Sequence, residues 1–200
     1  GAMYKRWAEL LEVELGVMQQ IQGEPIEKLV RIETFPCVDK VIAKYLHKEV
    51  KNETITTEKV ESIVDDRRNK IFFGVAQHTI NAMLEARRLF EDIEKKMAGL
   101  SITSADEGFK MYVNDLYIID QHYRHFFHEA KLAESTNLVN DIIPKVEQTY
   151  TNKFLSVLAN KWQPVVDAMD KWQITGVSTQ RSFFSTHVSP FTQKGKRIFV

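Results

Sequence analysis

The stretch SADEGFKMYVNDLYIIDQHYRHFFHE, residues 104–129, is the longest aromatic-rich segment of the chain that keeps a helical period. Its apolar side chains recur at steps of three and four, which places them on one broad face of an α-helix. They are Phe109, Tyr112, Val113, Leu116, Ile119, Tyr123, Phe126, Phe127 and Ala130. Ser104 is a favourable N-cap, and Glu107 follows three residues later, where a capping box places an acid. We expect one helix of about 26 residues whose ring-lined face is covered by other helices.

Further helical patterns fill most of the chain. They predict helices over 4–22, 25–34, 36–46, from 57 to a break near 74, and over 75–97, 138–158 and 162–172. The polar segment 48–56 is expected to be an exposed loop. Gly99 is expected to end the helix over 75–97, and a short turn then makes this helix the antiparallel neighbour of the central one. Pro144 marks either a kink or a new helix start, and Pro164 is expected in the first turn of the last helix.

The spacing also assigns faces to these helices. The first helix has an apolar face of Trp7, Leu10, Leu11, Leu15, Met18 and Ile21. In the helix that starts at Thr57, the pattern turns Val60, Ile63 and Val64 inward and Asp65, Asp66, Arg67 and Arg68 outward. In the helix over 75–97, the face is formed by Ile80, Met83, Leu84, Arg87, Phe90 and Ile93.

Composition limits the classes of function. The 200 residues carry 27 Lys and Arg against 27 Asp and Glu, so the chain lacks the basic footprint of a nucleic-acid-binding protein. A single cysteine, Cys37, excludes an internal disulfide and the structural zinc patterns, which favours a reducing, cytoplasmic location. No apolar run reaches the 18 or more residues of a membrane span. Only 8 glycines and 5 prolines favour long helices over a β-protein.

The predicted fold is an all-α multi-helix bundle with long antiparallel helices. Residues 1–3 resemble the remnant of a cleaved tag, and residues 4–175 are expected to form the helical domain. Residues 176–200 are richer in Ser, Thr and Gly, and they end in Ile198, Phe199 and Val200, which read as the start of a buried strand. We therefore expect an irregular C-terminal lead-in to a missing α/β domain.

Three segments carry a resemblance to a known family. They are MYVNDLYIIDQHYRHFFHEA (111–130), TYTNKFLSVLANKW (149–162) and QRSFFSTHVSPFTQKGKRIFV (180–200). The chain resembles the helical region that precedes the catalytic domain in the PglZ family, alkaline-phosphatase-superfamily proteins of BREX phage-defence systems. The resemblance covers nearly the whole chain, is most specific over 106–200 and is weaker before Lys48. It implies that the metal-binding residues of the family lie after Val200, so no catalytic, cofactor-binding or metal-binding residue is assigned in this chain.

Histidines on the polar flank of the central stretch are the strongest candidates for a metal site. His122, His125 and His128 step by three, and Asp120 or Glu129 could add an oxygen ligand. The HExxH spacing of helical zinc sites is absent, and hydrogen-bonded or solvated histidines beside an aromatic core are the plainer interpretation.

Other candidate sites have equally plain alternatives. Tyr112, Tyr117, Tyr123, Phe126 and Phe127, with Arg124 nearby, could stack nucleic-acid bases, but helical spacing favours burial in the core. The pairs Arg67-Arg68 and Arg87-Arg88 have acidic neighbours, and we interpret them as parts of exposed helix faces that carry ion pairs. The C-terminal tract contains serines and a histidine, but it lacks the GxSxG motif of serine hydrolases and a third catalytic partner. These residues are Ser178, Thr179, Ser182, Ser185, His187 and Ser189. Cys37 at a helix start could be a reactive thiolate, but a buried structural thiol is favoured.

These observations and the resemblance together predict a non-catalytic interaction and positioning module of a phage-defence protein. Its expected partners are its own C-terminal phosphatase-like domain and other BREX proteins, such as BrxB or the PglX methyltransferase. The alternative is a nucleic-acid contact domain, in which a local basic groove binds DNA despite the neutral total charge. A divalent metal is expected in the missing catalytic domain and no cofactor in this chain, and an independent enzyme has the least support.

Overall fold

The computed structural model describes residues 2–171, 173–177 and 180–192, and over these residues the fold is all-α without a strand, as predicted. The first half contains α1 (Ala2–Glu14), α2 (Val17–Ile21), α3 (Ile26–Leu29), α4 (Cys37–Lys51), α5 (Thr57–Arg68), the 3-10 turn η1 (Phe73–Val75) and α6 (Gln77–Met97). The second half contains α7 (Ala105–Met111), η2 (Tyr112–Leu116), α8 (Tyr117–Leu132), α9 (Thr136–Gln148), η3 (Thr149–Leu155) and α10 (Ser156–Asp167). A last helical run contains α11 (Gln180–Phe183), η4 (Phe184–Val188) and α12 (Ser189–Thr192).

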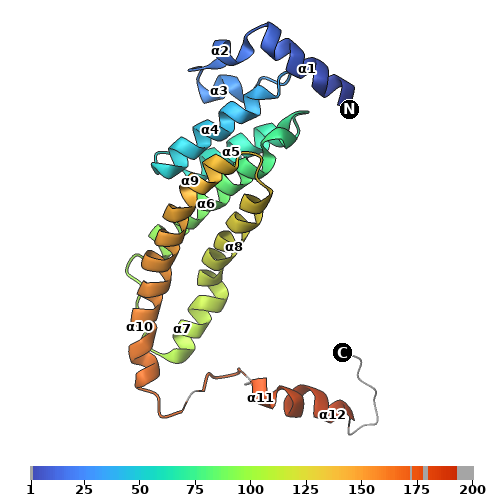
Figure 1. Cartoon of the computed structure of the whole chain (residues 1–200). Coiled ribbons are helices and arrows are strands. Elements are labelled where there is room, and N and C mark those ends of the chain that lie inside the picture. The colour runs from blue at the N-terminus through green and yellow to red at the C-terminus, as the bar shows by residue number, and fades with distance from the viewer. Residues whose placement is uncertain (1, 172, 178–179, 193–200) are drawn as a thin grey trace.

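Helix α6 is the centre of the bundle. It packs against α4, α5, α8 and α9, and its side chains Ile80, Met83 and Leu89 are fully buried. Every member of its predicted face is buried, and Gly99 follows the C-cap with a φ of 69°, the left-handed geometry expected of a glycine there. Figure 1 shows α6 and α8 lying side by side and joined through the α7 end, which confirms the predicted antiparallel pair.

The central stretch forms one rod from α7 to α8, but it is not uniformly α-helical. Ser104 is the N-cap, and its hydroxyl accepts a hydrogen bond from the Glu107 amide at 3.2 Å. The Glu107 carboxylate reaches the Thr103 amide at 2.8 Å, one residue before the position that a capping box uses. The π-helical segment η2 then inserts a wider turn, so the predicted face does not stay in line. Tyr112 and Val113 are 37% and 48% exposed, whereas the later members Ile119 and Phe126 are fully buried.

A second rod runs from α9 through η3 to α10. Pro144 lies inside α9, so no new helix starts there. Pro164 lies near the end of α10 and not in a first turn, because the expected break before Trp162 does not occur. This rod ends at Asp167, earlier than predicted, and Trp172 lies outside the described residues.

The N-terminal quarter differs most from the prediction. Gly16 has a φ of 60° and separates α1 from α2, so the helix expected over 4–22 is broken. The helix expected over 25–34 is limited to the four residues of α3. The predicted loop over 48–56 begins only after Lys51, because Val50 is fully buried and extends α4 by one turn.

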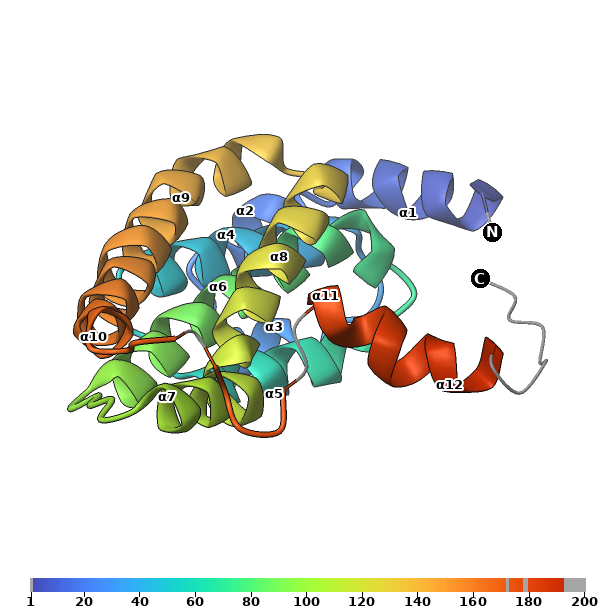
Figure 2. The ribbon, with the colours of Figure 1, turned by 90° about the horizontal axis from the view of Figure 1, so that it is seen from below.

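The C-terminal tract is more helical than its sequence suggested. The irregular lead-in expected over 176–200 contains the helical run α11–η4–α12. This run lies apart from the bundle in Figure 1, and Figure 2, which looks from below, shows it in front of the bundle. Before it, Ile174 is buried and Thr175 donates two hydrogen bonds to Asp106, its amide and hydroxyl each 2.7 Å from the carboxylate. The strand predicted at the end of the chain lies outside the described residues.

Candidate interaction surfaces

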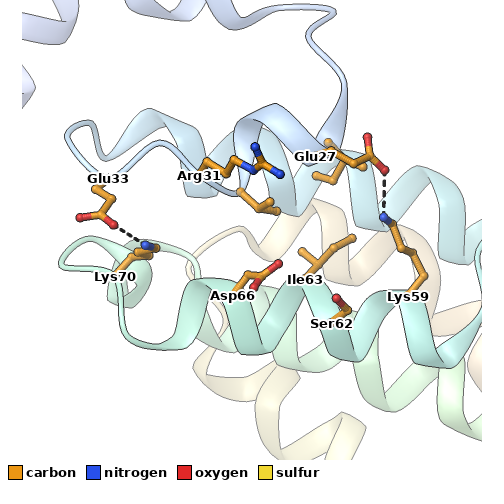
Figure 3. A pocket seen from close by; sticks show the side chains of 10 residues that line it. Glu27, Arg31, Glu33, Lys59, Ser62, Ile63, Asp66 and Lys70 are labelled. Atoms are coloured by element: carbon orange, nitrogen blue, oxygen red, sulfur yellow. Dashed lines mark hydrogen bonds and ion pairs between the residues drawn. The ribbon is translucent and has the colours of Figure 1, made fainter.

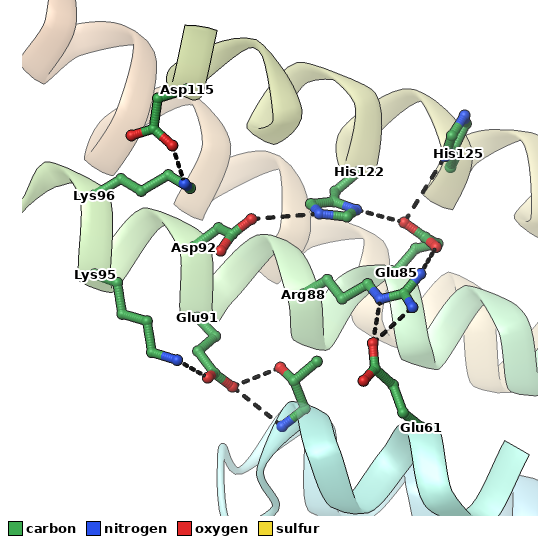
Figure 4. Close-up of polar contacts among 11 residues, drawn as sticks. Glu61, Glu85, Arg88, Glu91, Asp92, Lys95, Lys96, Asp115, His122 and His125 are labelled. Atoms are coloured by element: carbon green, nitrogen blue, oxygen red, sulfur yellow. Dashed lines mark hydrogen bonds and ion pairs between the residues drawn. The ribbon is translucent and has the colours of Figure 1, made fainter. Parts of the chain in front are cut away.

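The histidine flank of α8 forms a polar seam with α6 (Figure 4). His122 Nδ1 lies 2.7 Å from Glu85 Oε2, and its Nε2 lies 3.4 Å from Asp92 Oδ2. Arg88 extends the seam to α5, because it is 2.8 Å from Glu85 and 2.6 Å from Glu61. Acids and bases of three helices are therefore paired with one another along this seam.

The seam has the electrostatics of a structural contact. Burial would raise the pKa of Glu85, but the hydrogen bond and charge of His122 and the charge of Arg88 outweigh burial and lower this pKa. His125 is exposed and only 4.0 Å from Glu85, and His128 is exposed as well. No group of three or more His, Cys, Asp or Glu side chains suited to a metal ion occurs among the described residues.

The aromatic residues of the central stretch form a stack between the two rods. Tyr123 lies on Tyr150, with ring centroids 3.9 Å apart and planes at 15°, and Phe127 meets the edge of Tyr123. Phe126 is fully buried, Tyr123 and Phe127 are half-buried, and Tyr117 is 39% exposed. The expectation of core burial is therefore confirmed for Phe126 and wrong for Tyr117, and also for Tyr112, as described above.

One carboxylate links the π-helical segments η2 and η3. The Tyr112 hydroxyl of η2 and the Tyr150 hydroxyl of η3 both donate to Asp120 of α8. Burial and this hydrogen bond raise the pKa of the Tyr150 hydroxyl. Asp120 is therefore occupied by two tyrosines and is not presented as a metal ligand.

The prediction that Arg67 faces outward is wrong. Its side chain is fully buried and forms a bidentate pair with the equally buried Asp39, at 2.8 Å from Nε and 2.7 Å from Nη2. The same guanidinium donates to the carbonyls of Val30 and Ile32, so it joins α5, α4 and the chain after α3. A charged side chain at this depth is compatible with folding because each of its three nitrogens donates to an acceptor and its charge is paired.

Cys37 is a buried structural thiol, as favoured from the sequence. It is 2% exposed, and burial together with the neighbouring Glu12 raises its pKa to about 12. A thiol with such a pKa is almost entirely protonated at neutral pH, which is the opposite of an activated nucleophile.

The contacts described for Ser185 and His187 of the C-terminal tract are local ones. The Ser185 hydroxyl donates to the Ser182 carbonyl at 2.9 Å, and the His187 ring lies against Phe183. Ser178 and Thr179 lie outside the described residues.

A polar cleft separates α3 from α5 (Figure 3). It has a volume of about 490 Å3, and its floor is Ile26, Val30 and Ile63. Its rim carries three acids and three bases, namely Glu27, Glu33, Asp66, Arg31, Lys59 and Lys70. Ion pairs close it at both ends, with Lys59 2.8 Å from Glu27 and Lys70 bound to Glu33. Because these charges cancel, the cleft offers no net attraction to a charged ligand.

Helix α1 presents apolar side chains to solvent. Trp7, Leu10 and Leu11 are 60%, 53% and 46% exposed, and the adjoining Leu15 is 55% exposed. The apolar face of the first predicted helix is thus largely uncovered, and only Ile21 of its members is buried. Periodicity indicates that a helix has an apolar face, but not what covers that face. A cluster of this kind is typical of a protein contact surface.

A second apolar surface lies between α7 and α10. Phe109, Leu155, Leu158 and Trp162 line a groove of about 350 Å3. Gly108 forms its base, and a Cβ atom at this position would lie 1.9 Å from Cζ3 of Trp162. Only glycine therefore permits the tryptophan ring to lie this close to α7.

Comparison with known proteins gives two relatives. The chain is 28% identical over 200 residues, or 99% of its length, to the alkaline phosphatase-like protein PglZ of Bacillus cereus strain H3081.97. The chain is therefore similar to PglZ over nearly its whole length. It is also 27% identical over 180 residues, or 84% of its length, to the alkaline phosphatase-like protein BrxZ of Escherichia coli O9:H4 strain HS.

The PglZ-like chain spans less than a quarter of these relatives, 23% of the first and 21% of the second. No family model and no solved structure matches it. None of the described helices is long and apolar enough to cross a membrane. The family resemblance inferred from the three sequence segments is confirmed by these two relatives.

Proposed function

We propose that this PglZ-like chain is a non-catalytic helical module of a phage-defence protein, and that it binds its partners through the exposed face of α1. The observation that carries the proposal is the cluster of Trp7, Leu10 and Leu11, which leaves about half of each side chain in water. Full burial of such a side chain from water gains about 1.5 to 3 kcal/mol, so covering the exposed half of each gains roughly half as much, and tryptophan is enriched among residues that dominate binding.

The face is presented by a helix that is fixed to the bundle. The Glu12 carboxylate accepts a hydrogen bond from the Cys37 amide at 2.9 Å, at the start of α4. Tyr4 of α1 stacks on Phe72 with ring centroids 5.8 Å apart, and Ala8 of the same helix is buried. A preorganised face loses little conformational entropy when a partner binds.

The similarity to alkaline phosphatase-like proteins supports the choice of partners. Since most of the length of each relative lies outside the match, we propose that a phosphatase-like, metal-dependent domain is one of the partners. Other proposed partners are components of the same BREX system, such as BrxB or the PglX methyltransferase. In this proposal the helical module positions the phosphatase-like domain and the reaction takes place outside residues 1–200.

The test uses purified partners and a double variant. Each candidate, namely BrxB, PglX and the phosphatase-like remainder, is titrated separately with the chain and with Trp7→Glu/Leu10→Glu. We expect at least one candidate to bind and the double variant to bind it at least about tenfold more weakly. Leu132→Glu is the matched control, because Leu132 is 49% exposed on α8.

Two outcomes would contradict the proposal. One is that none of the three candidates binds, and the other is that the double variant and the control bind equally well. A gel shift with duplex DNA at two salt concentrations tests the nucleic-acid alternative. Strongly salt-dependent DNA binding that the double variant retains would favour that alternative.

A further inference from the structure

A group of basic side chains converges where the end of α4, α6, α9 and η3 meet. Arg87 comes from α6, Lys145 from α9 and Lys153 from η3, and Lys51 ends α4. The Glu53 carboxylate lies among them, with Oε1 2.7 Å from Lys145 Nζ. This group is separate from the α1 face, and nothing in the proposed function uses it.

Arg87 is the unusual member of the group. It is 7% exposed, and its Nε and Nη1 have no hydrogen-bond partner among the described residues. Glu53 Oε2 is 3.8 Å from Nη1, too far for a hydrogen bond, and Glu91 is 3.4 Å from Nη2. Buried donors without a partner are costly, and such a group in a folded protein points to an unseen ligand or water.

Glu53 is the acid that faces Arg87 Nη1. Its backbone has a φ of 56°, and it is the only non-glycine residue with a positive φ among those described. Its side chain is 39% exposed, whereas that of Arg87 is 8% exposed. The Glu53 carboxylate therefore reaches solvent, and the Arg87 side chain is almost completely buried.

Two hollows adjoin this position and share Glu53, Thr149 and Lys153. One has a volume of about 320 Å3 and the other about 520 Å3, the size range of small-molecule sites. The larger adds Lys51, Lys145, Gln148 and Asn152, which offer charges and amide groups. The acids on the walls are Asp141, which is held by His47 at 2.8 Å and Lys51 at 2.6 Å, and Glu94.

We propose that this position binds a phosphate monoester, with the phosphate between Arg87 and Lys145 in place of the Glu53 carboxylate. Arg87 Nη1 lies 3.8 Å from Glu53 Oε2, so a phosphate oxygen closer to it than this carboxylate would satisfy the free Nη1 donor with a charge-assisted hydrogen bond. A phosphate dianion gains more from Arg87, Lys145 and Lys153 than a single carboxylate does. The group attached to the phosphate would lie in the larger hollow, beside Gln148 and Asn152.

Calorimetric titration of the whole chain with inorganic phosphate, adenosine 5′-monophosphate and adenosine tests the phosphate requirement. We expect saturable binding of the first two and none of adenosine. A single-stranded oligonucleotide with a 5′-phosphate, compared with its 5′-hydroxyl form, then distinguishes a DNA end from a free nucleotide as the source of the phosphate. Equal binding of adenosine and its monophosphate would overturn the proposal.

Variants locate the site. Lys145→Met and Lys153→Met should each weaken binding by about tenfold or more, and Glu53→Gln should strengthen it by about tenfold, because a competing charge is removed. Lys28→Met is the matched control, since Lys28 pairs with Glu24 at 2.8 Å on the remote α3 side. Lys153 is exposed, so its variant keeps the test valid if Lys145→Met unfolds. Failure of both the wild type and Glu53→Gln to bind any phosphate probe, or binding that neither lysine variant weakens, refutes the site.

Discussion

At the scale of single residues, the buried pair of Arg67 and Asp39 joins three segments in the first half of the chain. It replaces apolar packing at the point where α4, α5 and the segment after α3 meet. A paired charge at such depth adds little net stability, but one partner without the other is strongly destabilising. The pair therefore favours the one arrangement of α4 and α5 that places Arg67 and Asp39 together.

Arg67→Met should lower the free energy of unfolding by about 3 to 5 kcal/mol, because the Asp39 carboxylate stays buried without its partner. The double variant Arg67→Met/Asp39→Leu should recover most of this loss. Urea unfolding followed by circular dichroism measures both. Arg68→Met is the control, since Arg68 is 64% exposed and its pair with Asp65 is 3.6 Å long, and it should change stability by less than about 0.5 kcal/mol. A double variant as unstable as Arg67→Met would show that the cost is not an unpaired charge.

At the scale of elements, α6 ties the N-terminus of α5 to the bundle through Glu91. The Glu91 carboxylate accepts hydrogen bonds from the Thr57 hydroxyl at 2.5 Å and the Thr57 amide at 3.1 Å. An acid at this end of a helix also complements the helix dipole. Lys95 and Thr57 together lower the pKa of Glu91 to about 2.

This contact predicts a specific acid sensitivity. The pKa of Glu91 is lower in the folded chain than its ordinary value of 4.5, so the contact stabilises fully above about pH 4.5 and its contribution is lost as pH falls toward 2. The stability advantage of the wild type over Glu91→Gln should be constant above that range and vanish through it. Thermal melts between pH 2 and 7 measure this, with the exposed Glu94→Gln as control. An advantage that persists unchanged to pH 2 would contradict the assignment.

The elements differ in how far their sequence predicts them. Helix α6 was predicted well because a regular period, a buried face and Gly99 all act within one segment. The burial of Arg67 was missed because it depends on Asp39, which no local pattern connects to it. Gly16 was not recognised as a break, because the apolar spacing continues across it. The residues of the α1 face could be predicted from spacing alone. Their exposure could not, because it depends on whether another helix packs against that face.

At the scale of the whole molecule, the bundle places its apolar surfaces at opposite ends. Figure 1 shows α1 at one end and α7 and α10, which line the groove, at the other, with α6 running between them. The equal numbers of acids and bases give the chain no net charge that would attract a charged partner from a distance. Association at each surface is therefore expected to depend on local shape and apolar contact.

Truncation tests where the bundle ends. A chain that stops at Val177 should keep the unfolding free energy of residues 1–200, because α11–η4–α12 lies apart from the bundle in Figure 1. A chain that stops at Asp167 should lose about 2 to 4 kcal/mol, since it lacks the buried Ile174 and the contact of Thr175 with Asp106. Chemical denaturation of the three lengths makes the comparison. An equal loss for both truncations would place the C-terminal run inside the cooperative unit.

The π-helical segments η2 and η3 have a consequence for how this molecule can change. Each lies within a continuous rod, and a π-helical turn holds about one residue more than an α-helical turn. Removing one residue from such a segment would therefore restore ordinary helical winding and leave the two halves of the rod close to their present orientation, whereas a deletion elsewhere in the rod would turn them by about 100° against each other. At η2 and η3 the rods can thus lose one residue while α8 and α9 keep their packing against α6 and the halves that carry the groove keep their direction.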